Sequence, residues 1–243
     1  MKRIIVSLLF IASCVFAQYE TSPSSDPYYH AHRGFYFNKA LGFIYTSTTK
    51  ATTDIYEKYT YEETNNFSGL ITHNEIRLGI SIANLVSIYA TGGFSYGTGS
   101  YEDEQKNTGE KFNEFSFEEA ESHNEDYRFI YGLGVEFYPI QDMDNSLYGL
   151  FLGLSAGVAI DNIYHTDHSF DYIDKDEIDC ADIGNFFFRF EVGKDWWFSR
   201  RWSFGVTLNY AIGFMDENDS YANFSEEISQ SSHTVGLAVR ITH

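Results

Sequence analysis

A strict two-residue alternation of bulky apolar and small side chains constrains this chain more than any other feature. It is clearest in "WSFGVTLNYAIGF", residues 202–214, where large groups such as Trp202 and Leu208 alternate with small ones such as Gly205 and Asn209. Successive side chains of a β-strand point to opposite faces, so this pattern predicts a strand with one bulky and one small face. A soluble sheet would carry charged groups opposite its core, and this second face is nearly uncharged.

The same pattern recurs in eight segments of 12–14 residues, namely 34–46, 70–82, 85–97, 127–138, 147–160, 184–197, 202–214 and 231–243. A tilted strand needs about 9–11 residues to cross the hydrocarbon layer of a membrane. Bacterial single-chain barrels of the outer membrane have an even number of strands. The sequence therefore predicts an all-β fold, a closed antiparallel up-and-down eight-stranded transmembrane β-barrel.

The connections between these segments alternate in length. Three are short (residues 83–84, 139–146 and 198–201), and four are long (residues 47–69, 98–126, 161–183 and 215–230). Short periplasmic turns and long extracellular loops are typical of outer-membrane barrels. We expect the long connections to be flexible, irregular loops, and we expect both termini to lie in the periplasm.

In such a barrel the bulky face meets lipid and the small face fills a narrow interior. Aromatic side chains near the strand ends predict two interfacial girdles. Those near the long loops are Tyr45, Tyr96, Tyr127 and Phe214, and those near the short turns are Phe35, Phe37, Phe137, Tyr148, Trp196 and Trp202. The alternative is a soluble barrel with an aromatic core, which would leave the uncharged second face unexplained.

The N-terminus has the pattern of a secretory signal. Lys2 and Arg3 precede a short apolar run that is too short to span a bilayer, and a cleavage site follows Ala17. The segment "IASC", ending at Cys14, also resembles a lipoprotein box, so lipoprotein processing is the alternative. We therefore divide the chain into a signal peptide (residues 1–17), a periplasmic N-terminal leader (residues 18–33) and the barrel (residues 34–243). After cleavage at Ala17 only Cys180 remains, which excludes an intramolecular disulfide.

Strand parity assigns eight charged side chains to the interior. They are Glu75, Arg77, Arg128, Glu136, Arg189, Glu191, Asp195 and Arg240, four of each sign. Unpaired charges in a narrow interior cost several kcal/mol each, so we expect a salt-bridge network that closes the lumen. A gated solute path or a proton relay is the alternative. Lys39 and Lys194 share the outward parity near the turn ends, where a lysine can reach the lipid headgroups.

The long connections carry most of the acidic residues of a chain whose net charge is −19. Such a surface repels phosphate, which excludes nucleic acid as a partner. The densest cluster comprises Asp171, Asp174, Asp176, Glu177 and Asp179, whose oxygens are hard ligands for calcium. Its spacing lacks the EF-hand glycine, so we assign no metal site and no cofactor. The open alternatives are a dedicated calcium site, diffuse divalent cations among anionic glycolipids, and simply solvated loops.

Two further sets of side chains are of the types that carry chemistry. His165 and His168 flank Asp167, but nothing fixes their geometry for a transition metal. Ser231 and His233 share the outward parity and are faintly similar to the lipid-facing pair of lipid A deacylase barrels. A serine nucleophile also needs an orienting acid, and the sequence identifies none. The chain is therefore expected to be non-enzymatic, with lipid modification as a remote alternative.

The strands "GFYFNKALGFIY", "LYGLFLGLSAGVA" and "HTVGLAVRI" resemble the eight-stranded outer-membrane barrels of the OmpA/OmpX type. The resemblance covers residues 34–243 and is architectural. It implies a monomer in the outer membrane of a Gram-negative bacterium, in contact with membrane lipid and lipopolysaccharide. The role it implies is structural, or interaction with a surface ligand; a porin-like narrow channel for small solutes or ions is the alternative. His243 departs from the terminal aromatic residue common in that family, and no peptidoglycan-binding domain follows the last strand.

Overall fold

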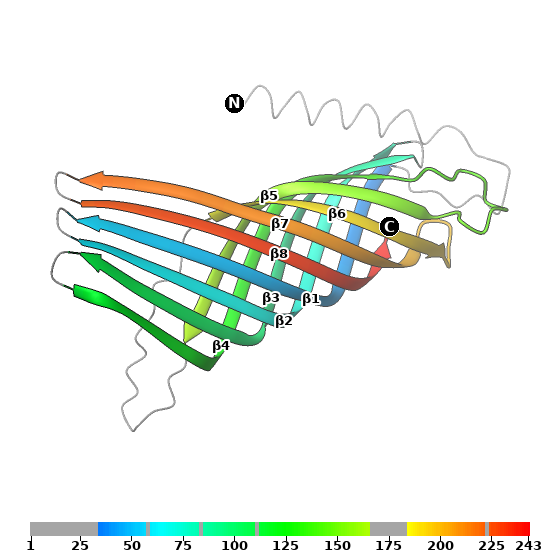
Figure 1. Ribbon diagram of the computed structural model, residues 1–243. Helices are drawn as coiled ribbons and strands as arrows, with labels where there is room; N and C mark the ends of the chain where they lie inside the picture. Colours follow the sequence, from blue (N-terminus) through cyan, green and yellow to red (C-terminus); the bar gives the residue numbers. More distant parts are fainter. Residues whose placement is uncertain (1–33, 57–58, 83–84, 110–111, 166–183, 222–223) are drawn as a thin grey trace.

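The computed structural model describes residues 34–56, 59–82, 85–109, 112–165, 184–221 and 224–243. The predicted signal peptide and leader lie outside these ranges. Eight strands follow one another in a single closed ring (Figure 1): β1 (Gly34–Tyr56), β2 (Tyr59–Ile82), β3 (Val86–Gly109), β4 (Phe112–Phe137), β5 (Leu150–His165), β6 (Gly184–Trp197), β7 (Ser203–Tyr221) and β8 (Phe224–Thr242). Within the described ranges, no helix has the length and apolar character needed to cross a membrane.

Pairing between the first and last strands closes the ring. β1 and β8 are antiparallel from Asn38 opposite Thr242 to Tyr56 opposite Phe224. Beyond that ladder, the backbones of Phe37 and His243 exchange two hydrogen bonds, of 3.1 and 2.8 Å. A closed ring leaves no unpaired strand edge in the hydrocarbon layer, which is the condition for a sheet to span a membrane. The predicted fold class is confirmed.

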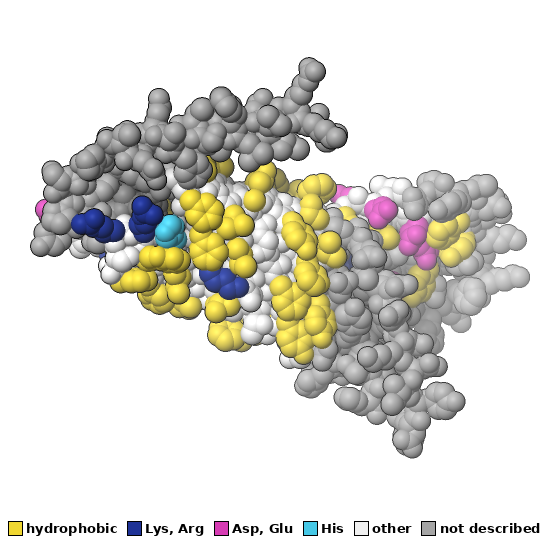
Figure 2. All heavy atoms as spheres, turned by 180° about the vertical axis from the view of Figure 1, so that it is seen from behind, with side chains coloured by type: hydrophobic (Ala, Val, Ile, Leu, Met, Phe, Trp, Pro, Cys, Tyr) yellow, Lys and Arg dark blue, Asp and Glu magenta, His cyan; other side chains and the backbone are white. Residues whose placement is uncertain are grey.

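The two faces of each strand meet opposite environments. In β8, Val235 and Leu237 are 50% and 59% exposed on the outside, while Ala238 and Arg240 are buried inside. Figure 2 shows hydrophobic side chains over the visible wall of the barrel, with acidic side chains beyond it on the extended strands. An apolar exterior around a polar interior is the reverse of a soluble barrel and matches a wall in contact with lipid.

Aromatic side chains mark both ends of the apolar wall. At one end the rings of Tyr96 and Tyr127 lie 4.8 Å apart, and at the other the rings of Phe37 and Trp202 lie 6.5 Å apart. Trp196 is 47% exposed at this second end. Amphipathic rings favour the headgroup level, so the two belts bracket the hydrocarbon layer.

The long connections differ from the flexible loops that were expected. Residues 47–69, 98–126 and 215–230 mostly continue the strands, and pairing reaches Ile55 opposite Thr60, Gly109 opposite Phe112, and Tyr221 opposite Phe224. The three hairpins project together to one side of the barrel (Figure 1). We call this side the hairpin end. Outside the membrane both faces of a strand meet water, so pairing continues without any alternation in the sequence. In the fourth long connection, β5 continues to His165, and residues 166–183 lie outside the described ranges.

The short connections lie at the opposite side, which we call the turn end. The connection between β4 and β5 is longer than predicted, because β5 starts at Leu150 rather than at Leu147. Gly149 has φ +84°, and a Cβ there would lie 2.2 Å from the carbonyl oxygen of Asp195. The Gly149 carbonyl accepts the Asp195 N–H at 2.9 Å. This close approach ends the turn and sets the first residue of β5.

Candidate functional site

The structure gathers seven of the eight predicted interior charges into one network near the turn end of the lumen. Its members are Glu75, Arg77, Glu136, Arg189, Glu191, Asp195 and Arg240, which come from β2, β4, β6 and β8. All seven are at most 5% exposed. We call this set the lumen network. Arg128, the eighth, lies nearer the hairpin end, where it donates to the hydroxyls of Thr46 and Thr234.

Arg77 is the centre of the lumen network. Its Nε donates to Glu75 at 2.6 Å, its Nη1 to Glu136 at 2.7 Å and its Nη2 to Glu191 at 2.6 Å. These three carboxylates stand on β2, β4 and β6, so one guanidinium connects distant parts of the wall. The planar fork of arginine makes this possible, since it presents five N–H groups in fixed directions.

Two bidentate pairs extend the network on either side of Arg77. Arg189 donates from both Nη atoms to Glu75, at 2.6 and 2.8 Å. Arg240 donates from Nε and Nη2 to Asp195, at 2.9 and 2.7 Å, and from Nη1 to Glu136 at 2.7 Å. Bidentate charge-assisted hydrogen bonds are among the strongest contacts available to side chains.

Neutral side chains that the sequence pattern does not single out complete the network. Tyr36 and Tyr138 donate to Oε2 of Glu136 at 3.0 and 2.9 Å, and Thr91 donates to Glu75 at 2.6 Å. His73 bonds Glu75 at 2.9 Å, and the Arg240 guanidinium carbon lies 3.5 Å from the centre of the Phe151 ring. Each shares the parity of a predicted interior charge or small residue, so the inward parity was the available signal. Inward parity predicts small and polar side chains, whereas the rings of Tyr36, Tyr89, Tyr138 and Phe151 are also buried there.

The electrostatics of the lumen network favour a rigid, closed arrangement. Burying a carboxylate or a guanidinium costs several kcal/mol, and only well-aligned partners offset that cost. Every arginine here contacts at least two carboxylates, so moving one side chain breaks several ion pairs together. The lumen network is therefore a set of buried, mutually paired charges that crosses the interior of the barrel.

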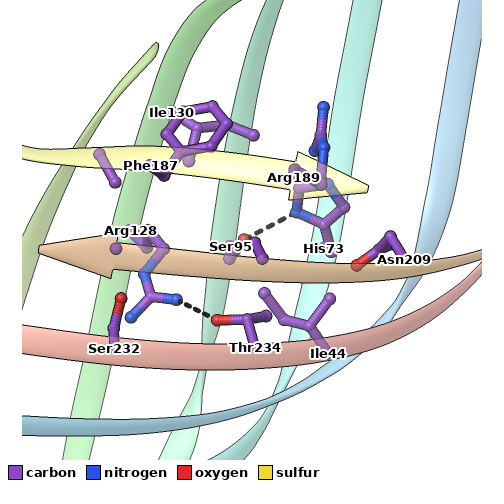
Figure 3. A pocket seen from close by; sticks show the side chains of 13 residues that line it. Ile44, His73, Ser95, Arg128, Ile130, Phe187, Arg189, Asn209, Ser232 and Thr234 are labelled. Atoms are coloured by element: carbon purple, nitrogen blue, oxygen red, sulfur yellow. Dashed lines mark hydrogen bonds between the residues drawn. The ribbon is translucent and has the colours of Figure 1, made fainter. Parts of the chain in front are cut away.

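A small chamber lies on the hairpin side of the lumen network (Figure 3). It has a volume of about 50 Å³. Polar side chains line it together with an apolar wall that includes Ile130 and Phe187. Within it His73 bonds Ser95 at 2.9 Å, and Arg128 bonds Thr234. A space of this size holds a few water molecules rather than a solute.

The outward-facing lysines have polar partners on the wall. Lys39 Nζ donates to the Asn74 side chain, a neighbour on β2 that also faces outward. Lys194 Nζ donates to the carbonyl of Ser146 and lies 5.5 Å from the centre of the Trp196 ring. Both contacts hold the ammonium group on the outside of the barrel, and no carboxylate among the described residues pairs with it.

Ser231 and His233 face outward on β8, as their parity predicts. The partner of His233 is Tyr210, whose hydroxyl lies 2.9 Å from Nδ1. The two rings are stacked with centroids 6.3 Å apart. The Tyr210 hydroxyl is therefore hydrogen-bonded to the ring nitrogen that bonds the orienting carboxylate in a catalytic triad.

The metal candidates fall mostly beyond what the structure describes. Asp171, Asp174, Asp176, Glu177 and Asp179 lie in residues 166–183, as do Cys180, Asp167 and His168. Among the described residues, no group of three or more His, Cys, Asp or Glu side chains is placed to hold a metal ion.

The edgeless ring and its apolar exterior define the chain as an outer-membrane β-barrel protein. Among solved structures it is similar to the outer membrane protein OprG from Pseudomonas aeruginosa, with 9% identity and a TM-score of 0.41 over 87% of this chain and 98% of that one. Ail of Yersinia pestis, solved in complex with the heparin analogue sucrose octasulfate, has 7% identity and a TM-score of 0.35 over 85% and 98% of the two chains. The outer membrane protease OmpT from Escherichia coli has 10% identity and a TM-score of 0.39 over 92% and 99%. No protein-family profile and no curated protein matches the sequence.

Proposed function

We propose that this protein is a closed, non-enzymatic barrel of the Gram-negative outer membrane, with a structural or surface-interaction role. The observation that carries the proposal is the lumen network. Its seven charged side chains cross the interior from β2, β4, β6 and β8 and leave no member more than 5% exposed. A solute would have to separate several buried ion pairs to pass, at a cost of several kcal/mol for each charge left alone.

The space between the described residues of the barrel is in keeping with a closed lumen. The chamber beside the lumen network has a volume of about 50 Å³. On the turn side, Tyr138 and Phe151 pack together with ring centroids 5.8 Å apart, and both are at most 2% exposed. The narrow-channel alternative would require these rings and the guanidinium groups to move together.

The extended hairpins support a surface role. From Tyr45 in the aromatic belt to Tyr56 at the end of β1, eleven residues rise about 35 Å along the strand. Acidic side chains are exposed on these strands, including Glu62, Glu104 and Glu217. Such a surface favours divalent cations as bridges to anionic lipopolysaccharide, and it repels nucleic acid. No resident cofactor is part of the proposal.

We place the hairpin end outside the cell and both termini in the periplasm. β1 and β8 begin and end at the turn end, where the connections are short, and outer-membrane barrels keep their short turns in the periplasm. Each wall strand is paired on both edges, so the barrel presents no exposed strand for a second copy, and we expect a monomer.

Planar-bilayer conductance tests the closed lumen. The wild-type barrel should show no stable discrete openings, whereas Arg77→Ser should show small cation-selective openings, because three carboxylates lose their shared counter-ion. Leu78→Ser, an adjacent substitution on the outer face, is the matched control and should remain closed. Stable openings of the wild-type protein would contradict the proposal and establish the channel instead.

The non-enzymatic assignment has a separate test. Purified protein is incubated with lipid A and the released fatty acid is measured. No release above that of a heat-denatured sample is expected. Release by the wild-type protein that is lost in Ser231→Ala would establish the enzyme.

A further inference from the structure

A groove crosses the outside of the barrel over β4 to β8. Two rows of outward side chains form its walls: Leu154, Phe190 and Tyr210 on the side nearer the hairpin end, and Leu152, Val192 and Leu208 on the other. The rows follow the strand pairing, since Leu154 stands opposite Phe190 and Phe190 opposite Tyr210. Between the rows, the floor is the backbone of residues whose side chains face inward or, at Gly153, are absent.

The size and direction of the groove suit an extended chain. Its volume is about 520 Å³, and five strands at about 4.8 Å spacing give it a length of about 19 Å. It runs obliquely. Val135 is two positions from Phe137, the turn-end terminus of β4, whereas Val235 is seven positions from Thr242, the turn-end terminus of β8. The groove therefore climbs from the turn end at β4 towards the hairpin end at β8.

The walls of the groove are apolar. Phe190, Leu154 and Leu208 are each about half exposed, at 53%, 52% and 51%. They lie within the apolar wall between the two aromatic belts, so the medium around them is hydrocarbon. A flexible hydrocarbon chain can follow such a groove and fill it with dispersion contacts.

A polar pair stands at the upper end of the groove. Tyr210 is its last wall residue on β7, and its hydroxyl bonds His233, which lies further toward the hairpin end on β8. A neutral histidine carries one ring N–H, so the pair has two donors and uses one of them in its own hydrogen bond. If His233 is protonated on Nε2, the Nε2–H remains available; if it is protonated on Nδ1, the Tyr210 O–H remains available. Polar groups that face lipid are costly and mark functional positions by default.

We propose that this groove binds one acyl chain of the outer-leaflet glycolipid, with the carbonyl of its ester accepting a hydrogen bond from the Tyr210–His233 pair. The glycolipid follows from the direction of the groove, because its polar end faces the hairpin end, and this step rests on the orientation in the proposed function. The acyl chain descends along β7, β6 and β5 towards the middle of the bilayer. Contact with general membrane lipid thereby becomes a defined site on one side of the barrel.

Native mass spectrometry of the detergent-purified full chain tests this site, with hexa-acylated lipid A and phosphatidylglycerol as separate probes. The wild-type protein should retain one lipid A molecule, and phosphatidylglycerol, which also carries ester-linked acyl chains, tests whether the groove takes any lipid. Val192→Trp places an indole in the groove and should weaken lipid A retention at least tenfold. Replacing both Tyr210 and His233 by Phe removes every donor of the pair and should weaken retention about fivefold. Leu78→Trp and Tyr131→Phe, outward substitutions away from the groove, are the matched controls and should bind as the wild type does.

Heat-modifiable gel migration verifies that each variant is folded, and Leu208→Phe serves as a milder groove-filling variant. Undiminished retention in folded Val192→Trp or Leu208→Phe would overturn the groove site. Equal retention of both probes would overturn the glycolipid as occupant. The result is independent of conductance: a barrel that conducts and still loses lipid A in Val192→Trp refutes the closed lumen and leaves the groove intact.

Discussion

Replacing Arg77 by methionine is the sharpest test of the lumen network. Methionine keeps much of the apolar length of the arginine side chain and removes its charge and all its donors. The substitution leaves Glu75 with Arg189 and leaves Glu136 with Arg240. Glu191 is affected most, because its other arginine contact, with Nε of Arg189, is 3.6 Å long.

The expected loss follows from the contacts of Arg77. Three charge-assisted hydrogen bonds of 2.6 to 2.7 Å disappear, and each is worth about 1.5–3 kcal/mol. The remaining arginines and entering water offset part of this loss. Breaking a buried ion pair by removing one partner typically costs about 3–5 kcal/mol. We therefore expect the free energy of unfolding to fall by about 4 kcal/mol.

The assay is reversible urea unfolding in lipid vesicles, followed by tryptophan fluorescence. Arg77→Lys is the informative companion variant, because it keeps the charge and loses the fork, and it should lie between the wild type and Arg77→Met. Leu78→Met, on the opposite face of the same strand, controls for the substitution of one outward residue by a flexible side chain. A loss below about 1 kcal/mol in Arg77→Met would refute the view that this guanidinium holds the network together.

Three further predictions concern other parts of the barrel. Burial, reinforced by the nearby Glu63 carboxylate, raises the pKa of Asp54 above its usual value. The β1–β2 hairpin should therefore gain stability as the pH falls from neutral through that raised pKa. Amide hydrogen exchange of the hairpin should show this gain, and Asp54→Asn should remove it. Gly205→Ala places a Cβ 2.0 Å from Oδ1 of Asp195 and should lower the free energy of unfolding in urea by about 1–3 kcal/mol. Gly92→Ala is the control: its Cβ meets nothing within 4 Å, and it should change that free energy by less than about 0.5 kcal/mol. The His243 ring lies 4.7 Å from that of Trp202. His243→Phe should therefore fold into vesicles at least as fast as the wild type, and His243→Asp should fold more slowly, as followed by heat-modifiable gel migration. Equal folding rates for all three proteins would contradict a role for the His243 ring.

The wall of the barrel was predictable, because the bilayer imposes a two-residue period on every strand that crosses it. Parity alone placed Arg240 inside and Leu237 outside, and the structure agrees at both positions. The same reasoning failed beyond the membrane. Residues such as Thr52 and Asp54 continue β1. Both faces of the strand are in contact with water there, so the sequence shows no alternation of apolar and polar residues that would predict a strand.

The lumen network was predictable in its membership and not in its pairing. Inward parity identifies Arg77 and Glu136, yet they lie 59 residues apart and meet only because β2 and β4 flank β3 in one register. Parity also says nothing about how far a side chain reaches across the lumen, which is why Tyr36 and Tyr138 were missed as partners of Glu136.

The number of strands, the side of each strand that meets lipid and the sign balance of the interior can all be predicted from the sequence, since each is a local property of alternating residues. The pairing of arginines with carboxylates, the reach of the hairpins and the position of the outer groove emerge only when the strands are assembled. These depend on the register between strands, which is set by the closure of the whole ring and is written in no single segment.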